Sequence, residues 1–322
     1  MKQLLVSLVF CAGFSVHAAA AAAEAYPARP IRFIVPQTPG GTSDIVARLV
    51  GQKLAEALKQ PVVIDNRNGA SGTIGAAIAA KAPPDGYTIL LAYTTHSTAP
   101  ALYEWLPYDP IRSFAAITIL ASAPLVLVVP PKVAATTFAE FVRIAKTGPR
   151  PLTFGTAGNG SGGHMAGELF KVMAQAPVVH IPYKGTGQAI TELIGGQTDF
   201  MFAAIVPVQP HVKSGRLRAL AVSSLRRSIT APDLPTVAES GLPGFEYIGW
   251  YAVLAPAETP ASIVARLYSE FVKILQSPNL RERLLADGAE TVGNTPAEFA
   301  AFLKTDLARW SKIIRQAGAK ID

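Results

Sequence analysis

The chain has 322 residues, of which 50% are hydrophobic and 16% charged, and its formal net charge is +7. This length can bury two cores, and the composition excludes a disordered or fibrous protein. Only Arg226 and Arg227 are adjacent basic residues. Because nucleic-acid binding needs clustered Lys and Arg, we expect no nucleic-acid partner. A diffuse positive field favours small anions instead.

Residues 1–25 predict a secretory signal peptide. Lys2 precedes an apolar run at 4–16 that is too short to span a bilayer, and the alanines at 18–23 suit cleavage. The only cysteine, Cys11, lies inside this segment. We therefore expect an exported, periplasmic mature chain without disulfides, which begins near residues 24–26. No later apolar run has membrane-spanning length without a proline or a charge, so we expect a soluble protein.

The stretch 31–54 predicts a strand, a glycine turn and a helix. Its apolar start indicates a buried strand, and Pro36–Gly41 breaks that strand. Thr42 and Ser43 can cap a helix, and Asp44 suits its first turn. Unpaired N–H groups at the helix start would favour an anion. The alternative is an ordinary turn between strand and helix, which the spacing by itself favours.

The rest of the chain alternates strand and helix patterns. Strands are predicted at 61–67, 87–92, 115–120, 125–129, 152–155, 178–181, 198–202, 217–222 and 245–254. Helices are predicted up to 81 and at about 138–145, 164–174, 186–194, 208–213, 261–276, 279–286 and 297–317.

This alternation predicts an α/β fold with parallel sheets and helices on both faces. The extended segments around Pro124 and Trp250 are long enough to cross between two lobes. We expect one lobe at 26–122 plus 249–322 and the other at 123–248. Ligands bind beyond the carboxyl ends of parallel strands, so two facing sheets would line one cleft.

Loops rich in Gly, Ser and Thr follow the predicted strands. They are Pro36–Asp44, Tyr93–Ser97, Thr156–His164, Tyr183–Gly185 and Asp199–Ala204. Backbone N–H groups and hydroxyls suit carboxylate oxygens, which only accept hydrogen bonds.

Three glycines in the loop Thr156–His164 formally match a dinucleotide motif. Gly158, Gly160 and Gly163 have GxGxxG spacing, but Tyr183 and Lys184 end the next strand where an acidic residue would bind a ribose. We therefore expect no dinucleotide and no other cofactor. An anion at this helix start remains consistent with the pattern.

The sequence gives little support for a serine hydrolase or a zinc site. Neither Ser161 nor Ser71 lies in a G-x-S-x-G elbow. The four histidines after the signal lack zinc-site spacing, so we expect no metal. His164 can pack or donate to a ligand, and packing is the commoner role. Lys184 can be solvated, and Asp199 can pair locally or contact a ligand amine or hydroxyl.

Several segments together carry a family resemblance: PQTPGGTSDIVARLVGQKL, PPDGYTILLAYTTHSTAPALY, GTAGNGSGGHMAGELF, HIPYKGTGQAITELIGGQTDF and WYAVLAPAETP. In order along the mature chain, they resemble the extracytoplasmic solute receptors of tripartite tricarboxylate transporters, the Bug or TctC-like family. The resemblance implies a type II periplasmic binding protein fold with a cleft between two α/β lobes. It also implies capture of a small carboxylate and delivery to a membrane permease. We expect a monomer.

The resemblance further implies a binding set from both lobes, in which the loop Pro39–Asp44 holds a carboxylate partly through ordered water. The first-lobe set is Gln37, Thr38, Gly40, Gly41, Ser43, Asp44, Thr94, Thr95 and His96. The second-lobe set is Thr156, Ala157, Gly158, Asn159, Gly160, Ser161, His164, Tyr183, Lys184, Asp199 and Ala203. Gln37 stands where relatives often have an aromatic residue, so the ligand stays open among di- or tricarboxylates, aromatic acids and amino acids.

The sequence therefore predicts a binding receptor without catalysis. Two alternatives remain. The closed form could signal to a sensor kinase of a two-component system, or a serine hydrolase could use Ser161 or Ser71 with a histidine.

Overall fold

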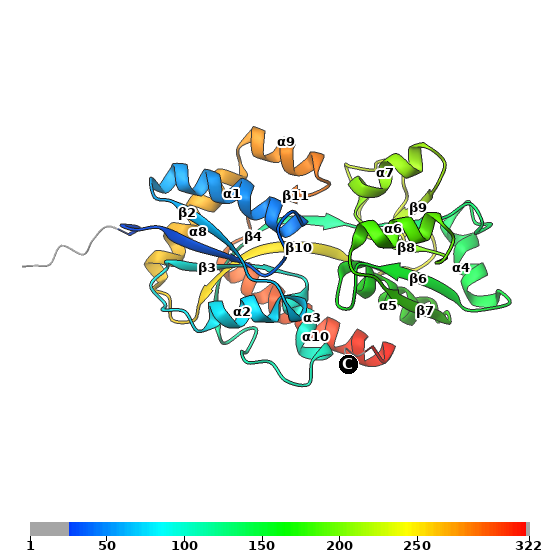
Figure 1. The fold of residues 1–322 in the computed structure, drawn as a ribbon, viewed down its shortest axis with the longest axis horizontal. Coiled ribbons are helices and arrows are strands. Elements are labelled where there is room, and N and C mark those ends of the chain that lie inside the picture. Colours follow the sequence, from blue (N-terminus) through cyan, green and yellow to red (C-terminus); the bar gives the residue numbers. More distant parts are fainter. Residues whose placement is uncertain (1–25, 320–322) are drawn as a thin grey trace, which may run out of the picture.

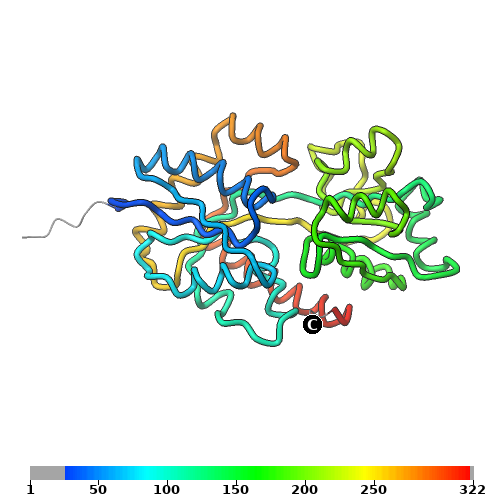
Figure 2. Tube along the Cα trace, in the orientation of Figure 1, coloured from blue at the N-terminus to red at the C-terminus, as the bar shows by residue number. Residues whose placement is uncertain are grey.

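The computed structural model describes residues 26–319. The predicted signal peptide and Cys11 lie outside these residues. Two lobes lie side by side, and extended strands run between them (Figures 1 and 2). Within the described range, no helix is long and apolar enough to cross a bilayer.

The first lobe is built on a six-stranded sheet. Its order is β11 (Glu290–Thr291), β4 (Phe114–Pro124), β10 (Ile248–Pro256), β3 (Thr88–Tyr93), β1 (Ile31–Val35) and β2 (Val62–Asn66). Strand β1 runs parallel to β2 and β3, but β10 runs antiparallel to both β3 and β4. The expectation of purely parallel sheets is therefore wrong here, because β10 returns from the second lobe against the direction in which β4 leaves.

Helices cover both faces of this sheet. Alternate residues of a strand point to opposite faces. Phe33 therefore packs with α1 (Thr42–Leu58), α8 (Ala261–Leu275) and α9 (Pro278–Ala286). Its neighbour Ile34 faces the core shared with α2 (Thr73–Ala80) and α10 (Pro296–Ala317). A single 3-10 turn, η1 (Ala70–Gly72), precedes α2.

The second lobe has two small sheets around an aromatic core. Strand β5 (Val126–Val129) pairs antiparallel with β8 (Met201–Ala203) and β9 (Arg218–Val222), while β6 (Leu152–Thr156) and β7 (Val178–Pro182) are parallel. The helices are α4 (Phe138–Thr147), α5 (Gly162–Ala174), α6 (Thr186–Ile194) and α7 (Ile205–Lys213). Phe154 and Phe200 stack at 5.4 Å between the sheets.

Two elements differ from the sequence prediction in ways that affect the site. The segment after β3 forms helix α3 (Thr95–Leu102), where a loop is expected. Its composition lacks a clear apolar period, and Pro100 lies inside it. Strand β8 begins only at Met201, so Asp199 precedes the strand.

Helix α10 begins on the first lobe and ends on the second. Trp310 in its second half packs on Tyr247, with ring centroids 5.7 Å apart, and Lys171 Nζ of α5 donates to the Ala317 carbonyl at 3.0 Å. The chain therefore joins the lobes by β4, by β10 and by this helix. The lobe boundaries at 122/123 and 248/249 stay predictions, since β4 and β10 pass through them.

Candidate ligand-binding site

The loop between β1 and α1 is fixed by a buried carboxylate. Asp44 Oδ2 accepts the Gly40 N–H at 2.9 Å, and Oδ1 accepts from Asn66 Nδ2 at 3.0 Å. The same Asn66 amide donates to the Gln37 carbonyl at 3.1 Å. Gly40 has φ +84, which favours glycine. Asn66 thus holds the start of the loop at Gln37 and Asp44 holds its end at Gly40, while Thr38 at the tip is exposed.

Asp44 therefore shapes the loop and is not placed to bind a carboxylate. It also pairs with Arg48 Nε at 2.8 Å. Burial raises its pKa, but the hydrogen bonds from Arg48, the Gly40 N–H and Asn66 more than offset this, and the pKa lies below its ordinary value. An ionised carboxylate only accepts hydrogen bonds, so it would repel a ligand carboxylate. The Asp44 side chain therefore holds the loop, and a ligand contact through the Asp44 backbone N–H in the first turn of α1 stays a prediction.

The first turn of α1 retains donors for a ligand. Its N-cap residue is Gly41, and no side chain caps the helix. The first N–H groups of a helix lack partners inside the helix and lie at its positive end. Ser43 adds a buried hydroxyl that has no hydrogen-bond partner among the described residues. The start of α1 thus combines N–H groups and a hydroxyl that an anion could use.

Helix α3 places Thr94 and Thr95 at the same edge of the sheet. Thr94 Oγ1 accepts the Trp250 N–H at 3.3 Å, and the Thr94 carbonyl accepts from Ser97 N at 3.1 Å. Burial raises the pKa of Tyr247 well above its ordinary value, against the effect of a hydrogen bond with Thr94. Thr94 thus connects the first lobe to the strand that returns from the second.

His96 belongs to the core of the first lobe. Its ring packs on Phe114 at 5.1 Å and Tyr108 at 5.9 Å, and Nε2 lies 2.9 Å from the Pro110 carbonyl. Burial lowers its pKa to about 4, against the effect of the bond to Pro110, so the ring is neutral at pH 7. His96 also lines a cavity of about 10 Å³ together with Ser71 and Thr95, which has room for about one water, and its contact with a ligand stays a prediction.

The loop from β6 to α5 is braced from inside the second lobe. Thr156 Oγ1 accepts the Gly158 N–H at 3.2 Å and lies 2.6 Å from His180 Nε2. The Gly160 N–H donates to His164 Nδ1 at 3.0 Å. Thr156 and His164 are both buried, so they fix the loop from behind. The exposed Asn159 forms its tip.

Ser161 caps helix α5 by accepting the His164 N–H at 3.4 Å. Over residues 26–319, the recorded hydrogen bonds join no imidazole nitrogen to the hydroxyl of Ser161 or Ser71. The contacts of both serines therefore give the hydrolase alternative no support. Ala157 lies half-buried between Thr156 and the glycine turn.

A second loop adjoins this one. Tyr183 N–H donates to the Thr156 carbonyl at 3.0 Å, which places the start of α6 beside the start of α5. Lys184 is exposed, and its N–H donates to Gln188 Oε1 at 3.2 Å. Ala203 ends β8 opposite Val126, at the end of the lobe where the chain enters from β4.

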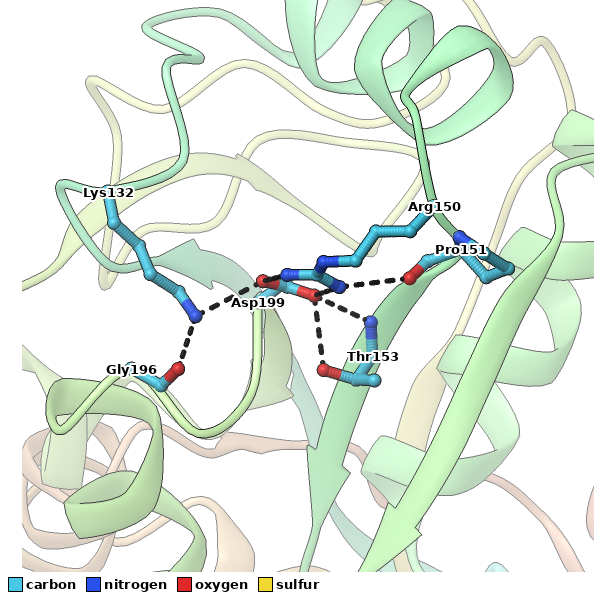
Figure 3. Close-up of polar contacts among 6 residues, drawn as sticks. All are labelled: Lys132, Arg150, Pro151, Thr153, Gly196 and Asp199. Carbon is cyan, nitrogen blue, oxygen red and sulfur yellow. Dashed lines mark hydrogen bonds and ion pairs between the residues drawn. The ribbon is translucent and has the colours of Figure 1, made fainter.

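Asp199 lies at the other end of the second lobe's strands (Figure 3). Arg150 binds both of its carboxylate oxygens at 2.8 Å, Lys132 lies 3.2 Å away, and Thr153 N–H donates at 2.9 Å. Thr153 is near the start of β6, whereas Thr156 ends that strand. The expectation that Asp199 faces the first lobe is corrected. Its carboxylate is bound by Arg150, Lys132 and Thr153, all within the second lobe, and we call this set of contacts the Asp199 clasp.

Some residues at the lobe junction could not be inferred from local patterns. Ser71 Oγ of the first lobe reaches the Asn159 carbonyl of the second at 3.4 Å. Tyr93 and Tyr103 hydroxyls hold Ser71 at 3.0 and 3.2 Å. Burial raises the pKa of Tyr251 to about 12, although a hydrogen bond with Thr42 opposes this. Of these three tyrosines, only Tyr93 lies at a strand end, so the sequence offers little signal for the junction.

Two α/β lobes joined by crossing strands (Figure 1), with the Ser71 turn of one lobe contacting the Asn159 loop of the other, have the architecture of the periplasmic solute-binding proteins. The family model described as "Tripartite tricarboxylate transporter family receptor" matches residues 46–319. The chain belongs to this family. The predicted family and the two-lobed α/β fold are thereby confirmed.

Known relatives agree with this assignment. Protein BugT of Bordetella pertussis is 38% identical over 324 residues, which cover 100% of this chain and 99% of BugT. The structure of R. palustris Rpa4515 with adipate has 35% identity and a TM-score of 0.82, covering 92% and 100% of the two chains. MatC from Rhodopseudomonas palustris with bound malate has 31% identity and a TM-score of 0.78, covering 90% and 100%.

Proposed function

We propose that this protein is an exported periplasmic receptor that captures a small carboxylate between its lobes and delivers it to the permease of a tripartite tricarboxylate transporter. Family membership supports the receptor role. The single observation that supports the site is the contact between the lobes, where Ser71 in the turn between β2 and α2 reaches the Asn159 carbonyl in the braced loop between β6 and α5. Adipate and malate, found with two relatives, are the first candidate ligands.

The chemistry of these loops suits an anion. The starts of α1 and α6, neither of which is capped by a side chain, offer N–H groups, which match oxygens that only accept hydrogen bonds. A negative charge at a helix start is stabilised by about 0.3–1 kcal/mol, and by more where the site is dry. Donors in both lobes favour a ligand with a carboxylate at each end. We therefore expect dicarboxylates to bind more tightly than monocarboxylates.

A thermal-shift screen followed by calorimetry tests the ligand class. Adipate, malate, citrate, benzoate and glutamate would be compared with adipamide and glucose as neutral controls. A ligand that binds only the native state raises the melting temperature, so we expect shifts with dicarboxylates and none with adipamide. Shifts confined to the neutral compounds would reject the carboxylate assignment.

Coupling to a permease needs a test in cells. Deleting the gene should abolish uptake of the ligand found in the screen, and export should be seen as recovery of a shortened chain from the periplasmic fraction. If deletion leaves uptake intact but removes ligand-induced gene expression, the protein serves a sensor instead. Retention of residues 1–25 in the recovered protein would contradict the predicted signal peptide.

A further inference from the structure

Ser71 is the point at which the turn between β2 and α2 contacts the opposite lobe. Its hydroxyl lies 3.4 Å from the Asn159 carbonyl, across 88 positions of sequence. That distance is at the long end of a hydrogen bond, so a small further closure of the lobes would strengthen it. Asn159 is the exposed tip of the braced loop between β6 and α5.

The backbone at Ser71 is in a conformation that L-residues rarely adopt. Ala70 has φ 44 and Ser71 has φ 54, both in the left-handed region. Consecutive residues of this kind are strained and persist only where the surroundings impose them. The Tyr93 hydroxyl supplies such a restraint by donating to the Ser71 carbonyl at 3.0 Å. Strain kept in a loop that contacts the other lobe points to a role for the contact.

The hydrogen bonds at Ser71 have a defined direction. The Tyr103 hydroxyl donates to Ser71 Oγ at 3.2 Å, which occupies an acceptor site of that oxygen. The single proton of Ser71 then points to the Asn159 carbonyl, which can only accept. Each bond polarises the next, so Tyr103 strengthens the bond that crosses between the lobes.

We propose that Ser71, oriented by Tyr103, is a latch that holds the lobes closed over the ligand and slows its release. This inference rests on the proposed function. Ser71 acts here as a positioning residue: it holds the loop at Asn159 and need not touch the ligand. Removing its hydroxyl should therefore change the rate of release much more than the rate of capture.

Stopped-flow kinetics with adipate or malate, whichever binds the wild type, tests the latch. A hydrogen bond of ordinary strength predicts that Ser71→Ala releases the ligand about three- to tenfold faster, with the association rate within about twofold of wild type. Ser71→Gly should do the same, because it also removes the hydroxyl while relieving the left-handed backbone. A wild-type release rate in Ser71→Gly would overturn the proposal.

A double-mutant cycle separates the latch from general loosening. Tyr103→Phe should speed release less than Ser71→Ala, and the double variant should match Ser71→Ala, because Tyr103 acts through Ser71. Tyr268→Phe, on α8 and away from the junction, is the matched control and should release ligand as wild type does. Fully additive effects of Ser71 and Tyr103 would contradict the relay.

A readout without ligand distinguishes failure of the latch from failure of the proposed function. Val63 and Val179 are exposed, one on each lobe, at 52% and 47%. Because the sequence has a single cysteine, at position 11 in the predicted signal, Val63→Cys and Val179→Cys allow specific labelling of the mature chain for energy transfer. Ser71→Ala should shift the ligand-free lobes further apart. An unchanged separation would overturn the latch even if no tested carboxylate binds.

Discussion

The imidazole rings of His164 and His180 stack with their centroids 3.9 Å apart and their planes 13° from parallel. One ring accepts the Gly160 N–H and the other contacts Thr156 Oγ1, so the pair supports both ends of the loop that carries Asn159. Burial and, to a smaller extent, the neighbouring His164 and Lys171 lower the pKa of His180 to about 3. His180 is therefore neutral at pH 7.

Acidification should therefore destabilise the wild type through His180. Its pKa in the folded state is below the ordinary 6.5, so its contribution is complete above pH 6.5 and is lost progressively as pH falls toward 3. His96, whose pKa is about 4, adds loss over pH 6.5 to 4. Urea unfolding at several pH values should show a shallower decline for His180→Asn, with lower stability at pH 7.5. Identical pH slopes would contradict this.

The clasp around Asp199 should matter for stability and little for ligand affinity. Although burial raises its pKa, hydrogen bonds from Arg150, Thr153 and Lys132 lower it to about 2. Asp199→Asn should lose about 1–3 kcal/mol at pH 7, typical of hydrogen bonds to a charged group. The difference should fade as pH drops from 3.8 through 2, where the carboxyl protonates.

The control for this variant is calorimetry with the ligand of the wild type. Asp199→Asn should keep its affinity, because the clasp is near the start of β6 and Thr156 is at its end. A large loss of affinity in a variant that remains folded would restore the ligand contact first expected for Asp199.

Two helical glycines should respond to alanine in opposite directions. A Cβ at Gly167 in α5 would lie 2.2 Å from Phe154 Cε2, so Gly167→Ala should cost about 1–3 kcal/mol through overpacking. At Gly187 in α6 nothing lies within 4 Å, and Gly187→Ala should gain about 0.5 kcal/mol from backbone entropy. Urea midpoints measure both. Equal effects would show that packing against Phe154 is not the cause.

Gly41 offers a test of the first-lobe loop. Its φ of −77 is open to any residue, and a Cβ there meets only Gln37 Oε1 at 3.5 Å and Thr38 O at 3.6 Å. Gly41→Val should therefore fold with nearly wild-type stability and yet lose carboxylate binding, since the side chain would cover the helix start. Gly40→Val, at φ +84, should be destabilised as well. Retained affinity in folded Gly41→Val would favour an ordinary turn.

Local patterns predicted the loops but not what their side chains face. Glycine and proline after apolar runs gave the turn at Pro36–Gly41, because those residues end strands through backbone geometry. The sequence predicts a loop at His96 because α3 has no apolar period, and the role of His96 as a core residue depends on Tyr108 and Phe114, which come later in the chain. Contacts between distant segments set such roles.

The same limit applies to the junction between the lobes. Ser71 and Asn159 are 88 positions apart, and neither segment carries a signal for the other. Asp199 looked like a strand-end residue because the pattern at 198–202 is extended, whereas the strand begins at Met201 and Arg150 captures the carboxylate. The class of fold follows from alternation along the chain, but pairing across lobes requires the three-dimensional structure.

Helix α10 has a mechanical consequence for the whole receptor. Two crossing strands alone would allow the lobes to twist as well as to bend about each other. Helix α10 is a third connection. Its Asp306 accepts a hydrogen bond from Trp250 in the first lobe, and its Ala317 carbonyl accepts one from Lys171 in the second. This connection resists twisting of the lobes and leaves bending as the easier motion. The mouth of the receptor should then open along one direction, so that the two lobes always present the same rim.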